Sequence, residues 1–316
     1  MALTYDDITA TTRKHFRPAL VDNIFNDIPL FKRFRERNAV SVRGGETIMQ
    51  SLLYATTTSV GSYSGYDVLS TTPNDQITAA EFDWKQSYVN ITIDGLSVMK
   101  NAGPEAVFNL LQKRVQVAQL SLANELATQL YSDGTGNASK DITGLQAAID
   151  NGDNVATYGG ILRDDYAWWC SDEQGNGGVN RAMTIALMED AFNAVEDGMD
   201  APSVITMDED CYRKFWALAE ADKSLMNVMQ GAMGLTGLSF NGIPIIKDRS
   251  HPANMIFFIN EKYLELVLHA EKNFVVRPFQ EPVDQDVMTS KVLVGLNLVS
   301  SNCRRQSRLA DIDPDL

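Results

Sequence analysis

Residues 104–131 read PEAVFNLLQKRVQVAQLSLANELATQLY, the clearest helical stretch of the chain. Its apolar side chains recur at helical spacing, at Val107, Leu110, Leu111, Val115, Leu120, Leu126 and Leu130. Pro104 suits the first turn of a helix, and Gly134 lies just past its end. At 1.5 Å per residue, about 27 residues span about 40 Å. Because this is long for a small globular domain, we expect the helix to form a spine on which other elements pack.

Two β-rich segments precede this helix, at residues 41–54 and 79–93. The second alternates apolar and polar side chains with period two, as in a strand. Between them, 10 of the 23 residues from 56 to 78 are Ser or Thr. A loop of this length without secondary structure is uncommon inside a compact domain. We therefore expect residues 41–93 to form a long two-stranded arm with a loop at its tip. Since an isolated hairpin is marginally stable in water, the arm needs a partner surface.

The segment before the arm combines apolar and basic side chains. An apolar stripe at helical spacing contains Val21, Ile24, Phe25, Ile28, Phe31 and Phe34. The basic residues are Arg13, Lys14, Arg17, Lys32, Arg33, Arg35 and Arg37. Pro29 ends or kinks the first helix of this segment. Such a short amphipathic segment must pack on its own body or on another subunit, and a solvated basic helix face is the alternative for its charges.

Residues 145–280 favour a mixed α/β domain. We expect a helix that ends at Gly198, a strand at residues 203–207 and a helix capped by Asp208. The buried face of the capped helix is expected to carry Tyr212, Phe215, Trp216 and Ala219. Asn241-Gly242 predicts a type I′ hairpin turn. Further strands are expected at residues 255–259 and 292–299.

The charge is large and unevenly distributed. The formal net charge is −14, from 27 basic and 41 acidic residues. Residues 1–43 contain eight Lys or Arg and five Asp or Glu, so the rest of the chain carries the acidic excess. Such a surface repels polyanions and disfavours a sequence-reading nucleic-acid binder. A basic segment on an acidic body makes self-association a natural choice of partner.

Motifs for chemistry are missing. The sequence contains neither a phosphate-binding GxxxxGK[ST] loop nor GxGxxG, and its three histidines have no metal-binding spacing. The three cysteines, Cys170, Cys211 and Cys303, are far apart and favour structural thiols in a reducing compartment. Trp168-Trp169 is assigned to core or interface packing rather than to a stacking platform. No apolar run is long enough to span a bilayer, and the first residues lack the pattern of a signal peptide. These features favour a structural or interaction protein over an enzyme.

The order of these parts resembles that of the tailed-phage major capsid proteins of the Hong Kong 97-type fold. Its most specific pieces are FNGIPI at residues 240–245, IFFIN at residues 256–260 and RRQSRLA at residues 304–310. The resemblance covers essentially the whole chain and implies an α+β capsid fold. It divides the chain into an N-terminal arm (1–40), an extended β-loop (41–93), the spine helix with the peripheral domain (94–144), an axial domain (145–273), and return strands of the peripheral domain with a C-terminal segment (274–316).

The resemblance also implies a function. Subunits of that family form pentamers and hexamers that close into the icosahedral head shell around double-stranded DNA, which they do not bind sequence-specifically. The expected location is the virion, assembled in the host cytoplasm, with scaffold, portal or decoration proteins as further partners and no membrane. No catalytic residue, cofactor or metal is expected. A cargo nanocompartment of the same fold is one alternative, and an α/β enzyme with a Cys/His site is another.

The arm and the loop embrace neighbouring subunits in that family. The expected inter-subunit contacts are therefore Val21, Ile24, Phe25, Ile28, Phe31, Phe34, Arg33, Arg35, Arg37, Tyr63 and Tyr66. Some members join subunits through a Lys–Asn isopeptide bond from the extended loop. Lys85 is the only lysine in residues 41–93 and lies at the root of the second strand, so we expect no covalent cross-link. We also expect a chain without residues 1–37 to keep a folded body and to lose shell assembly.

Overall fold

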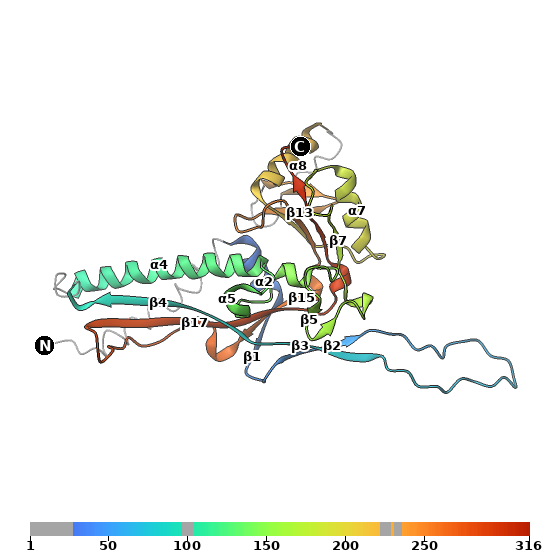
Figure 1. The fold of residues 1–316 in the computed structure, drawn as a ribbon, viewed down its shortest axis with the longest axis horizontal. Helices are drawn as coiled ribbons and strands as arrows, with labels where there is room; N and C mark the ends of the chain where they lie inside the picture. The colour runs from blue at the N-terminus through green and yellow to red at the C-terminus, as the bar shows by residue number, and fades with distance from the viewer. Residues whose placement is uncertain (1–27, 97–103, 222–228, 231–235) are drawn as a thin grey trace.

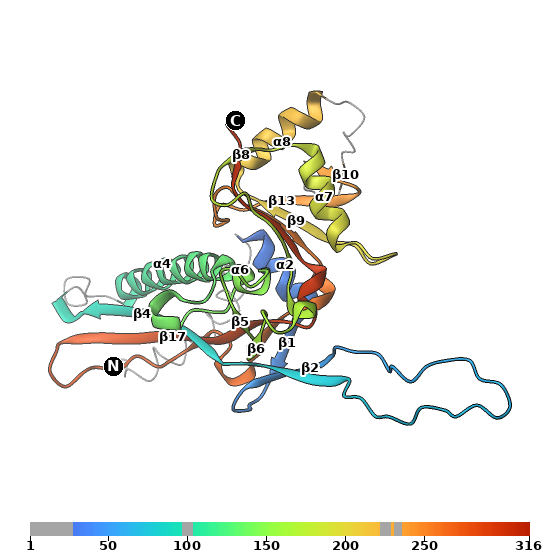
Figure 2. The same cartoon turned by 45° about the vertical axis from the view of Figure 1, so that its right-hand side comes forward.

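The computed structural model describes residues 28–96, 104–221, 229–230 and 236–316. Figure 1 shows a sheet and a long helix extending to one side, a thin arm projecting to the opposite side, and an axial domain standing above their junction. Figure 2 shows the same three parts from a second direction. The mixed α+β architecture predicted from the sequence is confirmed.

The sheet at the base, the peripheral sheet, is organised around one long strand. Its strands are β1 (Ala39–Val42), β4 (Lys85–Asp94), β15 (Leu264–His269), β16 (Val275–Val276) and β17 (Val287–Ser300). Strand β17 pairs antiparallel with β4, β15 and β16, and β1 adds to β15 in parallel. The strand expected at residues 292–299 is confirmed and is longer than the sequence predicted.

The predicted spine helix is α4 (Pro104–Tyr131), and it packs on β4. Its buried face includes Val115, Leu122, Leu126 and Leu130, which share one core with Ile91 of β4. We call this the peripheral core. Leu120 was expected on the buried face but is 51% exposed. The reason is that small alanines occupy the buried stripe beside the leucines, so the sheet meets a face rotated away from Leu120.

The arm consists of β2 (Ile48–Leu53) and β3 (Ile77–Phe82), which pair antiparallel and carry a long loop between them. The predicted two-stranded arm is confirmed, but its second strand is shorter than expected. The β-segment from residue 85 onward leaves the arm and becomes β4, because its apolar residues Ile91 and Ile93 are buried in the peripheral sheet. The period-two pattern correctly predicted a strand here, but that strand pairs with β17 of the peripheral sheet and not with the first strand of the arm.

The axial domain contains a second sheet and a second core. The strands run in the order β12 (Ser239–Phe240), β13 (Ile243–Lys247), β9 (Val204–Met207), β14 (Ile256–Ile259), β18 (Ser307–Leu309) and β7 (Asp172–Gln174). Helices α7 (Ile185–Val195) and α8 (Glu209–Ala221) contribute Met188 and Phe215 to this axial core. Asn241 and Gly242 have φ of 48° and 82°, as a type I′ turn requires.

The cap of α8 is also confirmed, since Asp208 Oδ1 accepts from the backbone N–H of Cys211 at 3.2 Å. Phe215 and Ala219 are buried as expected. Trp216 was expected on the same face but is 43% exposed. It follows Phe215 directly, and on a helix adjacent residues diverge by about 100°, so only one of the two rings faces the sheet.

The boundaries of the two domains differ from the expected ones. Residues 145–171, assigned to the axial domain, place Leu145 and Trp169 in the peripheral core. Strand β15, also assigned to the axial domain, belongs to the peripheral sheet. The C-terminal β18 returns to the axial sheet between β14 and β7. The chain therefore passes between the two domains several times, and neither domain is one continuous segment of the sequence.

Short elements complete the fold. The helical ones are α2 (Pro29–Asn38), α5 (Gly136–Ser139), α6 (Leu145–Ala148), η1 (Ala167–Trp169), η2 (Glu261–Tyr263), η3 (Ala270–Lys272) and η4 (Cys303–Arg305). The extended ones are β5 (Thr157–Tyr158), β6 (Ile161–Leu162), β8 (Arg181–Ala182), β10 (Met229–Gln230), β11 (Thr236–Gly237) and β19 (Ile312–Asp313). Among the residues that the structure describes, no helix is long and apolar enough to cross a membrane.

His251 is buried where the end of α4 meets the axial domain. Its ring lies 4.9 Å from that of Tyr131 and 5.1 Å from that of Phe257, measured between ring centroids. Its Nδ1 lies 2.8 Å from the carbonyl oxygen of Pro252. Burial lowers the pKa of His251 to about 4. The neutral imidazole is therefore the form that the fold accepts.

We predict that His251 makes the fold acid-sensitive. Its pKa is about 4 when folded and 6.5 when unfolded, so between these values the unfolded state binds more protons. Its contribution is complete above about pH 6.5 and is lost as the pH falls towards 4, by roughly 3 kcal/mol in total. Urea unfolding between pH 4.5 and 7.5 should show a flatter pH slope for His251→Phe than for wild type. Equal slopes for His251→Phe and wild type would contradict the prediction.

We further predict that two leucines of α4 differ sharply in their contribution to stability. Leu126 is fully buried and Leu120 is half-exposed. Leu126→Ala should lower the free energy of unfolding by about 2–5 kcal/mol because it leaves a cavity, whereas Leu120→Ala should cost less than about 1 kcal/mol. Chemical denaturation of both variants measures the difference. Similar losses would show that the assigned buried face of α4 is incorrect.

Candidate functional site

The described residues offer little for nucleophilic or metal chemistry. Cys303 is buried, and burial raises its pKa to about 11, while burial also raises the pKa of the Cys211 thiol well above its usual range. Burial likewise raises the pKa of Cys170. Thiols held in the protonated form are poor nucleophiles. Within the described ranges, no group of three or more His, Cys, Asp or Glu side chains is arranged to hold a metal ion.

The structure places part of the predicted N-terminal contact stripe inside the chain's own core. Val21, Ile24 and Phe25 lie outside the described residues. Ile28, Phe31 and Phe34 are 5%, 1% and 0% exposed and belong to the peripheral core. We therefore assign these last three to the intrachain core instead of the inter-subunit contact that the sequence predicted. The physical reason is that α2 packs directly on β15 of the same chain.

The basic side chains of α2 are likewise engaged within the chain. Arg33 forms a bidentate ion pair with Glu261 of η2, with Nη2 at 2.9 Å from Oε2, and Arg37 Nη1 lies 3.3 Å from the same oxygen. Ser203 Oγ also donates to Glu261 at 3.0 Å. The sequence predicted that Arg33 and Arg37 pair with a neighbouring subunit. In the structure both pair with Glu261 of the same chain. Arg35 is partly exposed.

The arm, in contrast, presents its apolar residues to solvent. Tyr63 is 68% and Tyr66 104% exposed, and both lie in the loop between β2 and β3, as predicted. Other exposed apolar side chains of the arm are Met49, Leu53, Val60, Val68, Leu69 and Ile77. Residues 46–83 contain five acidic residues and no Lys or Arg. Exposed apolar side chains gathered this densely mark an interaction surface, here an acidic one.

The peripheral sheet has a surface of complementary character. Ser87 Oγ donates to Gln129 of α4 at 3.1 Å, so the odd-numbered residues of β4 face the helix and the even-numbered ones face away. On the face away from α4, Tyr88 is opposite Leu293, which is opposite Val275. Around Tyr88 the open face consists of Gln86, Tyr88, Asn90, Val275, Arg277, Lys291 and Leu293. Thr92 and Asp94 lie on the same face at the far end of β4.

The charge of this open face is positive. Arg277 donates its backbone N–H to the carbonyl of Lys291 at 2.9 Å, which places the two residues side by side, and both side chains are exposed. None of the seven residues is acidic. Sequence reasoning missed this surface, because strands that are far apart in the chain build it. The only signal in the local sequence was the alternation along β4, which leaves every second side chain from Gln86 to Asn90 exposed.

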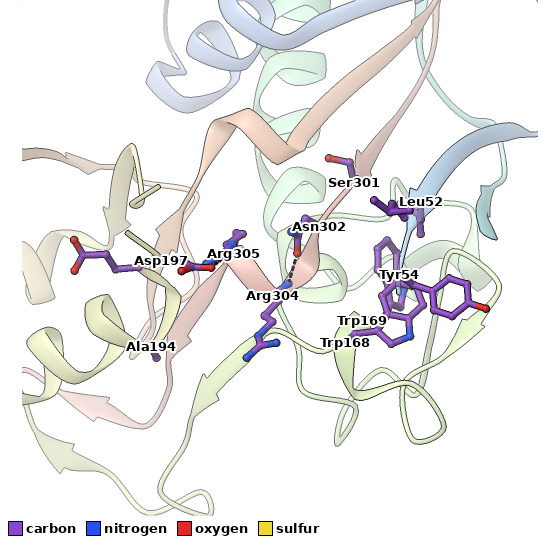
Figure 3. Close-up of a pocket in the computed structure, with 12 residues that line it drawn as sticks. Leu52, Tyr54, Trp168, Trp169, Ala194, Asp197, Ser301, Asn302, Arg304 and Arg305 are labelled. Carbon is purple, nitrogen blue, oxygen red and sulfur yellow. Dashed lines mark hydrogen bonds and ion pairs between the residues drawn. The ribbon is translucent and has the colours of Figure 1, made fainter. Parts of the chain in front are cut away.

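A groove lies between the base of the arm and the axial domain (Figure 3). Its volume is about 470 Å³, and its walls include Leu52, Tyr54, Trp168 and Arg304. The rings of Tyr54 and Trp168 stack with centroids 5.5 Å apart. Trp169, in contrast, is buried and donates its indole N–H to the carbonyl of Tyr158 at 2.9 Å. Trp169 belongs to the peripheral core and Trp168 packs against it, as expected, and both residues also line the groove.

Comparison with solved structures shows the fold. The chain is similar to the capsid of cyanophage A-1(L), with 18% identity, a TM-score of 0.65, and coverage of 90% of this chain and 93% of that one. It is similar to the SrpI encapsulin of Synechococcus elongatus PCC 7942, with 11% identity, a TM-score of 0.60, and coverage of 92% and 90%. It is also similar to the capsid of a native GTA particle, with 14% identity, a TM-score of 0.58, and coverage of 90% of each chain.

The spine helix, projecting arm and axial domain, together with these similarities, define the class: capsid proteins of the Hong Kong 97-type fold. The sequence model of the SU10 major capsid protein family matches residues 88–289, well over half of the chain. The chain belongs to the SU10 major capsid protein family, and it is a structural subunit of the icosahedral head shell of a tailed bacteriophage. No curated protein matches the chain.

We predict that Arg33 and Arg37 contribute unequally to the fold. The Arg33 and Glu261 side chains are 14% and 6% exposed, whereas that of Arg37 is 55% exposed. Arg33→Met should therefore lower the free energy of unfolding by about 3 kcal/mol, because it leaves a buried carboxylate short of its main partner. Arg37→Met should cost less than about 1 kcal/mol. Urea denaturation of the two variants decides between this account and a purely inter-subunit role, for which neither isolated subunit would be destabilised.

Proposed function

We propose that shell assembly depends on the acidic arm of one subunit binding the open face of the peripheral sheet of a neighbour. The observation that carries the proposal is charge complementarity within a chain of net charge −14. The arm between residues 46 and 83 has no basic residue, and the open face exposes Arg277 and Lys291. Opposite charges steer the encounter and set the register, while exclusion of water from apolar side chains supplies affinity.

Apolar side chains on the two surfaces also match. The arm exposes Tyr63 and Tyr66, and the open face exposes Tyr88, which is 70% accessible, beside the partly exposed Leu293. Aromatic residues are enriched at the centres of protein interfaces. Many such contacts of moderate strength, repeated around pentamers and hexamers, let a growing shell release a wrongly placed subunit. Residues Val21, Ile24, Phe25 and Arg35 remain proposed inter-subunit contacts.

The further roles follow from the family. We propose that the shell assembles in the host cytoplasm, encloses double-stranded DNA without sequence-specific contacts, and uses scaffold, portal or decoration proteins as partners. The acidic net charge supports weak DNA binding. The protonated thiols and the family match support a protein without catalytic activity. SrpI encapsulin shares the fold, and the contents of purified particles, double-stranded DNA or protein, test the assignment to a phage head.

Charge reversal tests the arm proposal. An arm variant, Asp67→Lys with Asp75→Lys, and a sheet variant, Arg277→Glu with Lys291→Glu, should each stop the formation of shells at physiological salt. The quadruple variant restores complementary charges and should regain shells. Negative-stain electron microscopy and analytical ultracentrifugation measure assembly.

A control variant separates this contact from net charge alone. Lys247→Glu with Arg249→Glu changes the net charge as much as the sheet variant does, but on the axial domain. It should assemble more completely than the sheet variant. Assembly of the sheet variant at the wild-type level, or a quadruple variant that stays unassembled, would refute the arm–sheet contact.

We also predict that assembled shells contain no covalent cross-links. Lys85 lies in β4 and not in the arm, and its Nζ donates to the carbonyl oxygen of Ser139 in the same chain at 2.7 Å. Shells boiled in denaturant should therefore give a single gel band near 34.9 kDa. A ladder of heavier bands that persists in Lys85→Arg would mean that another residue forms a cross-link.

A further inference from the structure

A buried row of four charged side chains joins the two domains. Asp150 lies between Arg163, whose Nη1 is 3.6 Å from Oδ2, and Arg308, whose Nη2 is 2.8 Å from Oδ1. Arg308 Nη2 also lies 2.6 Å from Oε1 of Glu173. The four side chains are between 0% and 11% exposed. Charges therefore alternate along the row, and their sum is zero.

The four residues come from both sides of the junction. Asp150 and Arg163 lie in segments that pack on the peripheral core, after α6 and after β6. Arg308 and Glu173 lie on β18 and β7, two neighbouring parallel strands of the axial sheet, and are paired in register. Within this buried row, Arg308 pairs across the junction with Asp150 and within the axial sheet with Glu173.

The peripheral half of the row is rigidly held. Asp150 accepts from the backbone N–H groups of Gly152 and Val155 and from Asn154 Nδ2, each at 2.9 Å. Although burial acts in the opposite direction, these hydrogen bonds keep the pKa of Asp150 below its usual value. Arg163 Nη2 donates to the carbonyl oxygens of Ala147 at 2.8 Å and of Ala148 at 3.0 Å. The carboxylate that Arg308 meets therefore has a fixed position.

A contribution to the free energy of unfolding does not by itself explain why four charged side chains are buried here. Buried ion pairs often contribute no more than well-packed apolar residues of the same volume. Arg308 Nε is moreover buried without a hydrogen-bond partner among the described residues. Apolar contacts also join the two domains, because Val204, Phe257 and Ile259 of the axial sheet pack in the peripheral core. Such contacts fix an orientation less specifically than ion pairs, which depend on direction and distance.

We propose that the row Arg163–Asp150–Arg308–Glu173 sets the angle between the axial and peripheral domains and thereby the diameter of the closed shell. The inference takes both domains to lie in the shell, so that a change of the angle between them alters its curvature. This inference rests on the proposed function only in requiring that shells form.

The test compares variants that separate angle from stability. Arg308→Met leaves Asp150 with Arg163 as its remaining cation, and Glu173→Gln removes the outer charge with little change of shape. The double variant Glu173→Gln with Arg308→Met removes one charge of each sign and leaves the Arg163–Asp150 pair in place. Arg305→Met is the matched control, because Arg305 pairs with Asp197 across the same junction but at the surface.

Three measurements are made on the full chain: urea unfolding, hydrogen exchange, and shell diameters by electron microscopy. Arg308→Met should lose exchange protection at residues 146–155 and 307–309 and give shells of mixed diameter, and Glu173→Gln should do so to a smaller degree. The double variant should regain stability relative to Arg308→Met and still give mixed diameters. Arg305→Met should give the single wild-type diameter.

Two results would overturn the proposal. Uniform wild-type diameters for a double variant that regains stability would show that the row acts through stability alone. If the double variant does not fold, uniform diameters and unchanged exchange for Glu173→Gln would have the same force. Wild-type protein that forms no shells at all would instead contradict the proposed function.

Discussion

The antiparallel ladder between β4 and β17 is the contact on which the rest of the structure depends. It pairs ten residues of β4, from Lys85 to Asp94, with residues Val287 to Leu296, which are nearly 200 positions away in the chain. One face of the ladder supports α4, and the other is left open as the basic surface. The arm leaves the body at the point where β3 ends and β4 enters the ladder.

This arrangement separates the apolar residues near the N-terminus into two groups with different partners. Phe31 and Phe34 are buried because β15 provides a surface for α2 within the chain. Tyr63 and Tyr66 have no such surface, because the loop that carries them extends beyond both cores (Figure 1). The side chains left exposed on the folded subunit are therefore those available to neighbours, and the proposed contact joins the acidic arm to a neighbour's basic sheet surface.

The subunit contains two hydrophobic cores that meet at the junction between the peripheral and axial domains. The axial sheet lies between the two cores, because β9 and β14 place Val204 and Phe257 in the peripheral core and Ile205 and Phe258 in the axial core. The chain crosses between them at β18, which carries Arg308 back to the carboxylate of Asp150. A direction-dependent contact at this crossing adds a defined geometry to the apolar packing of the junction.

Elements that depend only on neighbouring residues could be predicted from the sequence alone. The periodicity of α4, the Asp208 cap and the Asn241-Gly242 turn all depend on neighbours within a few positions, and all three were predicted correctly. The general fold followed from their order. The partner of β4, the burial of Phe34 and the exposure of Leu120 required the folded chain, as did the row of charges around Asp150. An amphipathic pattern states that a face is buried but not against what, because the covering surface comes from residues far away in the chain.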